Sequence, residues 1–429
     1  MNSMYNLLKK LYPLNRTLVS DDNDKAMHYL NNYIPEMKIL SIPTGTECWT
    51  WKIPEKWTVN EAYVSDGEKK LIDVKDHILH LMSYSLPKEG WVSKKELMEH
   101  ITTAQSYTAD GGYRVPENEN AIPWVMQYYE RDWGFAVEKS KLKKFTNEKY
   151  YVKIDTEFED GSMKIGELTI KGKNKDTIVI ISDLCHPYQV NDSITGVVVA
   201  AEVAKELEKL KTNYTFQFLF LPETVGSIAY LSQNEKNIKN YKYGIFSEML
   251  GHKNNFVLQY SKQKTSKIDR VAEYCLKKEG DYRTGDFRKV LQNDEGVFNG
   301  PGVNIPTISI SRWPYPEYHT NLDNPSIIIP EQLEKSKDLM LDILTTIDRD
   351  YIPKRKFKGP VFLSGYGLWV DWRKHKKLNE NLELIMMMLE GEHSCFDIAE
   401  KLEMDFDEVD NFLKKLYENN LITINSEAL

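Results

Sequence analysis

The chain has 429 residues, 41% of them hydrophobic and 28% charged, a balance typical of a globular protein with roughly two to four domains. Its formal net charge of −8 provides no basic field, which argues against general binding to nucleic acid or to anionic membranes. No apolar run approaches the roughly 20 residues of a membrane helix, and the first residues, MNSMYNLLKKLY, are typical of an amphipathic helix and not of a signal peptide. The cysteines are scattered without a CxxC pair, so we expect no disulfide framework and a reducing, cytoplasmic location: Cys48, Cys185, Cys275 and Cys395.

The amino-terminal part of the chain changes character twice. Roughly the first 40 residues have helical patterning. Residues 44–149 are then rich in tryptophan, tyrosine, proline and turn residues, with a turn dipeptide at Asp66-Gly67. We interpret residues 44–149 as a compact, mainly β module.

From about Asp176 onward, short apolar strand patterns alternate with helical spacing such as Val199, Val203 and Leu207. This alternation implies right-handed crossovers between parallel strands. We therefore predict an α/β domain, residues 1–43 and 150–352, with a mostly parallel sheet flanked by helices.

The last segment, residues 358–429, predicts a winged-helix-like domain. Helical patterns at 394–402 and 406–417 precede a short strand pattern at 421–424. The segment from Asn379 onward holds 13 acidic and 3 basic residues, and acidic residues begin the helix that would enter a DNA groove. We therefore expect no nucleic-acid binding. The apolar run at 382–389 needs a partner surface instead, either the α/β domain or a second subunit of a homo-oligomer.

Four residues suited to metal binding or proton transfer each come shortly after an apolar strand pattern. The patterns span residues 177–182, 216–221, 243–247 and 307–311, and the residues that follow them are His186, Glu223, Glu248 and His319. The carboxyl ends of parallel strands share one edge of an α/β sheet, and ligands bind there. We therefore expect these side chains to form one metal-assisted site.

Five motifs surround these residues. They are DLCHPYQVNDSITG at 183–196, LPETVGS at 221–227, NDEGVF at 293–298, GVNIP at 302–306 and EYHTNLD at 317–323. The set resembles the motifs of the co-catalytic zinc aminopeptidases, the clan of the bacterial leucine aminopeptidases and glutaminyl cyclases. Over nearly its whole length the chain resembles bacterial aminopeptidase-like domain proteins, which carry an inserted domain of unknown function and a C-terminal winged helix. The sequences TGTECWTWKIPEKW at 44–57 and YYERDWGF at 128–135 resemble that inserted domain.

The resemblance implies a site for one or two zinc ions, with a fixed set of ligands and Glu223 as the general base. The implied ligands are His186, Asp192, Glu248 and His319.

Two positions depart from the family's pattern. Thr224 replaces the second glutamate of a Glu-Glu pair, which is normally a ligand to one zinc. Tyr188 replaces the aspartate that normally orients the first histidine. We therefore expect unequal metal sites, with the second zinc absent, weakly held or completed by another group.

Each candidate also has a structural alternative. Asp192 suits a helix N-cap, although one side chain can cap a helix and bridge two metals. Glu223 could cap the following helix, and Glu248 could pair with a lysine. His186 could be an ordinary loop histidine, but its spacing to Asp192 favours a ligand.

Some neighbouring residues have weaker assignments. His252 follows Glu248 by four residues, but we expect it at the surface. Glu317 and Asp323 flank His319 and could hydrogen-bond its second ring nitrogen.

Four further residues lie near the expected cleft. Asp294 and Glu295 are expected in a structural loop, with a direct role in the site as the alternative. Arg312 and Tyr315 are candidate substrate-binding residues that could grip a carboxylate, with a loop anchor as the alternative.

Together these features predict a zinc-dependent aminopeptidase-like hydrolase that cleaves a peptide or small amide bond. Zinc would lower the pKa of a water to roughly 7, and Glu223 would pass its proton to the leaving amine. The aromatic insert would restrict access to small substrates or chain ends. Two alternatives are a zinc protein of another activity, such as acyl transfer or biosynthetic tailoring, and a catalytically silent scaffold acting through partners, which Thr224 favours.

Overall fold

The computed structural model describes residues 3–109, 113–115 and 117–425, and the chain forms two compact units. The first unit is Met1–Asp269 with Glu279–Leu341, and the second is Arg270–Lys278 with Asp342–Leu429. The predicted domains also include residues 1–2, 110–112, 116 and 426–429, which lie outside the described residues. Across the described ranges, no helix has the length and apolar character that crossing a membrane requires.

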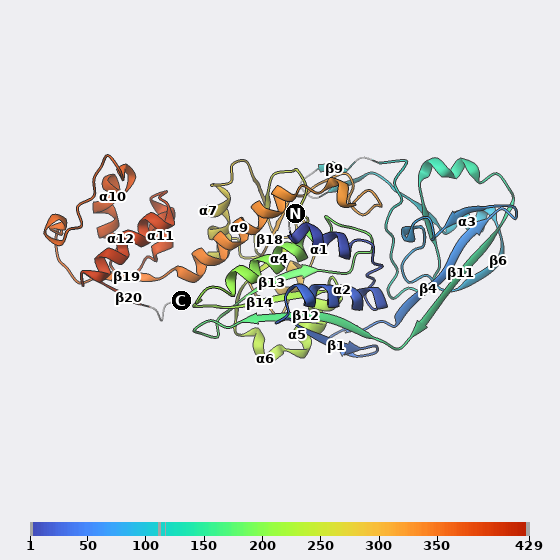
Figure 1. The fold of residues 1–429 in the computed structure, drawn as a ribbon, viewed down its shortest axis with the longest axis horizontal. Coiled ribbons are helices and arrows are strands. Elements are labelled where there is room, and N and C mark those ends of the chain that lie inside the picture. Colours follow the sequence, from blue (N-terminus) through green and yellow to red (C-terminus); the bar gives the residue numbers. More distant parts are fainter. Residues whose placement is uncertain (1–2, 110–112, 116, 426–429) are drawn as a thin grey trace. The chain divides into compact units, whose positions relative to one another are not determined.

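An eight-stranded mixed sheet forms the centre of the first unit (Figure 1). Its strand order is β1 (Lys38–Pro43), β12 (Ser162–Ile170), β14 (Thr215–Leu221), β13 (Thr177–Asp183), β15 (Tyr241–Ser247), β18 (Thr307–Ser311), β16 (Val257–Gln259) and β17 (Arg283–Gly285). Strands β14, β13, β15 and β18 are parallel neighbours, whereas the pairs β1–β12, β12–β14 and β16–β18 are antiparallel. The sheet is therefore mixed: its centre is parallel, as predicted, and a further parallel pair, β16–β17, lies at one edge. That centre consists of the four strands predicted from the sequence.

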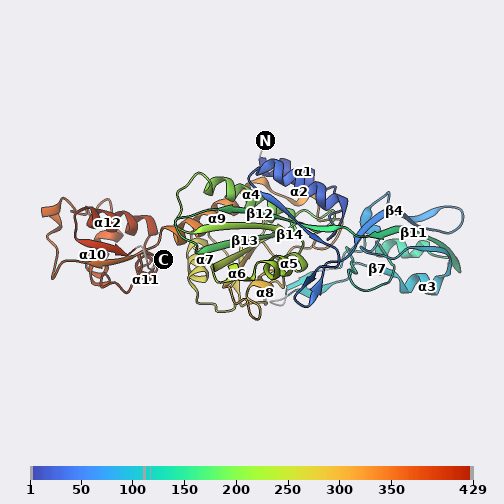
Figure 2. The same cartoon turned by 90° about the horizontal axis from the view of Figure 1, so that it is seen from below.

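Helices cover both faces of this sheet (Figure 2). One face carries α1 (Ser3–Leu11), α2 (Asp21–Tyr33) and α4 (Ile194–Leu207), and the other carries α5 (Val225–Gln233), α6 (Glu235–Ile238) and α8 (Glu295–Phe298). Every residue of β13 is buried as a result, which explains its continuous apolar and β-branched sequence. Two further helices, α7 (Lys267–Leu276) and α9 (Pro330–Arg349), each have residues in both units.

The start of α4 lies directly against the end of β15 because Gly196 has no side chain. A Cβ atom at this position would lie 1.9 Å from the carbonyl oxygen of Ser247. The loop before α4 contains Asp192, and Glu248 follows Ser247. The close approach therefore brings these two carboxylates to the same place.

Residues 44–149 contribute mainly short strands to the first unit. Strands β4 (Lys56–Ser65), β5 (Lys70–Asp73), β6 (Lys88–Ser93) and β11 (Lys149–Glu159) form an antiparallel sheet in the order β5-β4-β11-β6. Three small pairs accompany it: β2 (Glu47–Cys48) with β3 (Trp51–Lys52), β7 (Ile101–Thr103) with β10 (Phe135–Val137), and β8 (Tyr107–Ala109) with β9 (Tyr113–Val115). One helix, α3 (Lys94–Glu99), follows β6. Because β11 belongs to this sheet, the sheet continues to Glu159, past the predicted boundary at 149.

The second unit contains helices and one strand pair. The helices are α10 (Lys376–Met387), α11 (Cys395–Lys401) and α12 (Phe406–Glu418), and β19 (Ile352–Arg355) pairs antiparallel with β20 (Ile422–Asn425). A capping box fixes the start of α11, where Ser394 and Asp397 each accept the other's backbone N–H. Since β19 pairs with β20, this unit begins before the predicted boundary at 358. Its assignment as a winged helix stays a prediction.

Candidate metal centre

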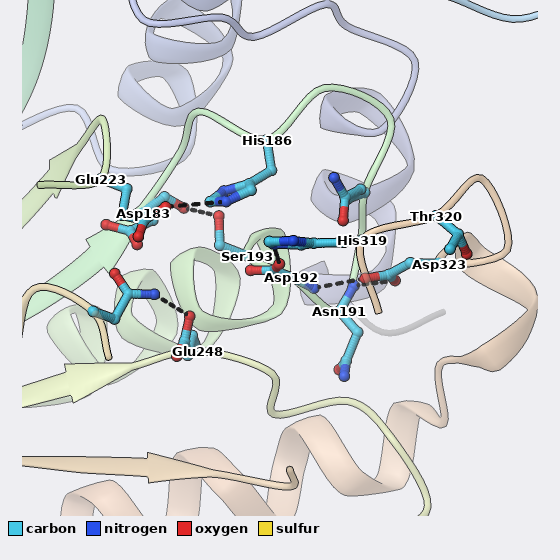
Figure 3. A network of polar contacts seen from close by, with 12 residues as sticks. Asp183, His186, Asn191, Asp192, Ser193, Glu223, Glu248, His319, Thr320 and Asp323 are labelled. Atoms are coloured by element: carbon cyan, nitrogen blue, oxygen red, sulfur yellow. Dashed lines mark hydrogen bonds and ion pairs between the residues drawn. The ribbon is translucent and has the colours of Figure 1, made fainter. Parts of the chain in front are cut away.

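The parallel centre of the sheet brings the predicted site residues together at its carboxyl edge (Figure 3). His186 and Asp192 follow β13, Glu223 follows β14, Glu248 follows β15, and His319 follows β18. One ligand atom from each of His186, Asp192 and His319 lies within 4.8 Å of the others, and the same holds for Cys185, His186 and Glu223. The strand ends thus bring His186, Asp192 and His319 together, and His186 also lies beside Glu223, while the role of these residues as metal ligands stays a prediction.

Two close contacts define the cluster. His186 Nε2 lies 3.2 Å from Glu223 Oε2, and His319 Nε2 lies 3.0 Å from Asp192 Oδ2. The side chains of His186 and Asp192 are only 1% exposed, whereas those of Glu223 and His319 are 25% and 35% exposed. The cluster is thus accessible from the side of Glu223 and His319.

The buried charges of the cluster shift one another's pKa values. Burial raises the pKa of Glu248 well above its usual range, and the negative charges of Asp192 and Glu223 add to this shift. Burial also acts to raise the pKa of Asp192, but His186 and His319 outweigh it and the pKa is lowered. Burial acts to lower the pKa of His186, but Asp192 and the neighbouring Cys185 and Glu223 raise it well above its usual value. The cluster therefore favours a bound positive charge.

The buried carboxylates of this cluster have few hydrogen-bond partners among the described residues. Apart from the contact with His319, neither oxygen of Asp192 has a hydrogen-bond partner among the described residues. Glu248 Oε2 accepts a hydrogen bond from Asn293 Nδ2 at 3.0 Å, but within the same described ranges Oε1 has none. Burying carboxylates is costly unless hydrogen bonds or a cation satisfy them. Two imidazoles beside two such carboxylates are the donor set that zinc uses, so these residues fit the implied metal.

Asp323 supports the Asp192 loop and does not orient His319. Its buried carboxylate accepts the backbone N–H of Asn191 at 2.7 Å and of Asp192 at 3.0 Å, and the hydroxyl of Tyr315 at 2.7 Å. Burial raises the pKa of Asp323 to about 7. Among the described residues, Asp323 thus accepts from the Asp192 loop and from Tyr315, and not from the second ring nitrogen of His319, which was one option that the sequence left open.

Arg312, His252 and Glu317 also have partners within the fold. Arg312 donates to the carbonyl oxygens of Leu250 at 3.1 Å and Asn254 at 2.7 Å. His252 is buried, not exposed as expected, and its Nε2 lies 3.9 Å from Glu317 Oε2. The contacts of Arg312, like those of Tyr315, match the structural alternative, a loop anchor, and give no support to substrate binding.

Asp294 lies beside the position where the expected second glutamate is missing. It is buried, and its two carboxylate oxygens accept the backbone N–H of Thr224 at 3.1 and 3.2 Å. Burial raises its pKa to about 6. Glu295 has a structural role, since it accepts hydrogen bonds from Gln259 and Asn293. Asp294 thus brings a carboxylate to Thr224, although it binds the main-chain N–H there.

Sequence reasoning missed two residues of the site, Asn293 and Trp124. Asn293 holds Glu248, as described above. Trp124 comes from the inserted segment, and its ring lies edge-on to His186 at 4.5 Å and to His319 at 4.9 Å between ring centroids. No spacing rule connects Trp124 to the strand ends, and the aromatic richness of residues 44–149 was the only available signal.

The sheet and its helices define the aminopeptidase-like α/β class of fold. BSAP, a zinc aminopeptidase from Bacillus subtilis, has a similar structure with a TM-score of 0.58 and 14% identity, covering 80% of this chain and 94% of that one. A crystal structure described as a "putative peptidase" from Clostridium acetobutylicum is similar over 98% of this chain and 96% of that chain, with a TM-score of 0.86 and 31% identity.

The chain belongs to the family described as "Domain of unknown function (DUF4910)", whose model matches residues 5–350. A relative from Clostridium acetobutylicum is 31% identical over 434 residues, which cover 98% of this chain and 96% of the relative. That relative is named "Putative polysaccharide biosynthesis protein with aminopeptidase-like domain".

Proposed function

We propose that this protein is a zinc-dependent aminopeptidase-like hydrolase that cleaves a peptide or small amide bond. The observation that carries this proposal is a pair of buried carboxylates beside two imidazoles: among the described residues, Glu248 Oε1 has no hydrogen-bond partner and Asp192 has only its contact with His319. His186, Asp192, Glu248 and His319 would hold zinc. Bound zinc would make a water more acidic and polarise a carbonyl group.

Glu223 is the side chain placed to move protons. It lies 3.2 Å from His186, inside the cluster, yet its side chain is 25% exposed and can meet a substrate. Its backbone N–H donates to Cys185 Sγ at 3.2 Å, which fixes the turn that presents it. We assign Glu223 the role of taking a proton from water and returning it to the leaving amine.

Metal content and hydrolysis are the direct tests. Elemental analysis of untagged protein purified without chelators should find at least one zinc ion per chain, and a panel of aminoacyl and peptidyl amides should reveal a substrate. A protein that holds no transition metal, and takes none when zinc is added, contradicts the proposal.

The number of metal ions follows from Thr224. Because this position lacks a carboxylate and Asp294 binds the main chain of Thr224, we expect one tight and one weak zinc site. Titration calorimetry on stripped protein should show two unlike affinities or a single event. Two equal, tight sites would mean that another residue supplies the missing ligand.

A second candidate is a zinc-binding scaffold or a repurposed enzyme in a biosynthetic pathway. Thr224 favours it, and so does the name of the Clostridium acetobutylicum relative, which refers to polysaccharide biosynthesis. This candidate predicts bound zinc without hydrolysis of any amide in the panel.

A further inference from the structure

The inserted segment reaches the candidate metal centre through one buried side chain, Trp124. Its indole ring is 7% exposed and lies edge-on to both His186 and His319, at interplanar angles of 64° and 86°. Both centroid distances, 4.5 and 4.9 Å, fall in the range that aromatic pairs prefer. We propose that Trp124 is a positioning residue that holds the two histidine ligands in place, so that the inserted segment is part of the metal centre. This inference rests on the proposed zinc site.

The main chain around Trp124 is fixed to the loop that carries His319. Trp124 donates its backbone N–H to the carbonyl oxygen of His319 at 2.8 Å. Ile122 and Asn321 exchange two hydrogen bonds, from Ile122 N–H to Asn321 Oδ1 at 2.8 Å and from Asn321 N–H to the Ile122 carbonyl at 3.0 Å. Pro123 and Thr320 form an antiparallel bridge between these contacts. The segment 122–124 therefore pairs with 319–321 like a short strand, and Trp124 cannot move independently of His319.

The other side of the same segment is anchored to the insert. Ser83 donates its backbone N–H to the carbonyl oxygen of Val125 at 2.9 Å and accepts the N–H of Gln127 on its own carbonyl at 3.0 Å. The indole Nε1–H of Trp124 points to Ser83 Oγ at 3.4 Å. These contacts connect the insert to the two histidines through one rigid aromatic ring.

His186 needs such support because its other contacts are weak. A metal-binding histidine usually donates its second ring N–H to a carboxylate, a carbonyl or water, which fixes the ring. Here Nδ1 contacts Cys185 Sγ at 3.7 Å, and a thiol is a weak acceptor. Tyr188, at the position of the expected orienting aspartate, packs instead on Tyr12 and His77, with ring centroids 5.6 and 5.2 Å away. The indole ring of Trp124 therefore orients the His186 ring in place of that aspartate.

His319 is held from both sides. Tyr318 stacks on its ring at 3.7 Å between centroids and 16° between planes, and Trp124 meets it edge-on. The rings of His186 and His319 are 5.8 Å apart, and Trp124 contacts both. Removing the indole would therefore free both imidazoles together.

The test compares zinc affinity in three variants of the full chain. In Trp124→Ala, competition with a chromophoric chelator should show zinc binding about 10–100-fold weaker, the usual effect of losing a residue that orients a metal ligand. Trp124→Phe keeps an aromatic edge and should recover most of the affinity, with a cobalt absorption spectrum like that of the wild type. Trp133→Ala is the matched control, because Trp133 is a buried tryptophan of the same insert that stacks on His100 at 3.9 Å. It should leave zinc affinity unchanged.

A second readout works without metal. In stripped protein, diethylpyrocarbonate should modify His186 and His319 faster in Trp124→Ala than in the wild type or in Trp133→Ala, as measured by peptide mass spectrometry. If Trp124→Ala does not fold, Asn321→Ala, which removes the acceptor of the Ile122 N–H, should show a smaller change in the same direction.

The outcomes separate this inference from the proposed function. A wild-type protein that binds no metal contradicts the proposed function, and the modification rates then decide the role of Trp124 alone. Zinc affinity and modification rates that are unchanged in folded Trp124→Ala overturn the positioning role, even if the wild type binds zinc tightly.

Discussion

Carboxylates are buried in both units of the chain, but their surroundings differ. In the second unit, Asp410 is fully buried and is held by Arg349 Nη2 at 2.6 Å, Lys414 Nζ at 2.7 Å and the Tyr351 hydroxyl at 3.1 Å. In the first unit, Asp192 and Glu248 are as deeply buried, yet oxygen atoms of both lack such partners in the described part of the chain.

This difference in hydrogen-bond and ion-pair partners distinguishes a structural carboxylate from a candidate metal ligand. A buried carboxylate with two cations and a hydroxyl is satisfied within the fold, and its loss costs stability. A buried carboxylate without them costs free energy in the metal-free protein, and a bound cation would remove that cost. Acidic residues therefore mark a metal centre through their missing partners and not through their abundance, since they form a larger fraction of the second unit.

The largest expected effect is on catalysis at Glu223. We expect Glu223→Gln to lower kcat by about 10²–10⁴-fold, the usual contribution of one general base, while zinc content and folding stay unchanged. Steady-state kinetics on the best amide of the panel, with elemental analysis of the same samples, measures both. A variant that keeps full activity would remove Glu223 from the mechanism.

The comparison predicts a large loss of stability for one substitution and a small change for a similar one, both in metal-free protein. Asp410→Asn should lower the free energy of unfolding by about 3 kcal/mol, because it leaves two cations without their buried partner. Glu248→Gln should change it by less than about 1 kcal/mol, because burial already favours the neutral form and Asn293 can still donate to the amide oxygen. Urea denaturation of stripped protein measures both values.

Added zinc should remove most of the difference in stability between these two variants. At a zinc concentration of 100 times the Kd, binding adds about 2.7 kcal/mol to the stability of a protein with an intact site. Asp410→Asn should keep this gain, whereas Glu248→Gln should lose most of it. Equal gains in both variants would show that Glu248 is not a ligand.

The buried acid of α8 predicts a pH dependence of stability. Burial raises the pKa of Glu295 to about 7, so the folded protein still holds this proton at pH values where the unfolded chain has released it. Between about pH 4.5 and 7, the free energy of unfolding of the wild type should therefore fall relative to Glu295→Gln, by up to about 3 kcal/mol. Denaturation curves across this range check the sign. A difference that is constant with pH, or that grows in favour of the wild type, would contradict it.

Much of the site followed from the sequence because strand ends are local features. The strand patterns at 177–182, 216–221, 243–247 and 307–311 match β13, β14, β15 and β18 to within two residues at each end. Since parallel neighbours align their carboxyl ends, the residues after those strands had to converge. The resemblance to zinc aminopeptidases added Asp192, which no strand pattern marks.

The supporting residues could not be read from the sequence, because their contacts are long-range. Asp323 lies four residues after His319, which suggested a bond between them, but the chain turns so that it binds the main chain of Asn191 and Asp192. Trp124 reaches the site through hydrogen bonds to residues almost 200 positions away. The extent of the β11 sheet was missed because a strand can pair on either side of a predicted domain boundary.

We expect a smaller effect on subunit association from the apolar surface of α10. Leu384 and Met387 are 49% and 69% exposed, and a cavity of about 580 Å³ lies between this helix and residues 355–363. We propose that this surface packs against a second subunit or the catalytic domain. Sedimentation of a chain truncated before Lys376 should show a changed association state or lower stability. Unchanged association and stability would leave the surface without this role.

The last prediction concerns DNA binding, and we expect none that can be measured. Non-specific affinity for DNA comes mainly from lysines and arginines that neutralise phosphates. From Asn379 onward the sequence has three lysines and 13 acidic residues. The first turn of α12 carries Asp407 and Glu408, and the N-cap Asp405 accepts the backbone N–H of both, so this helix start presents carboxylates where a DNA-reading helix would meet phosphates. These acids differ from those of the metal centre because they are exposed or paired, and they need no cation. Fluorescence anisotropy of the full-length protein with duplex DNA at low salt tests the prediction. Salt-sensitive binding at micromolar protein or tighter would show that the charge of the module does not determine its partner.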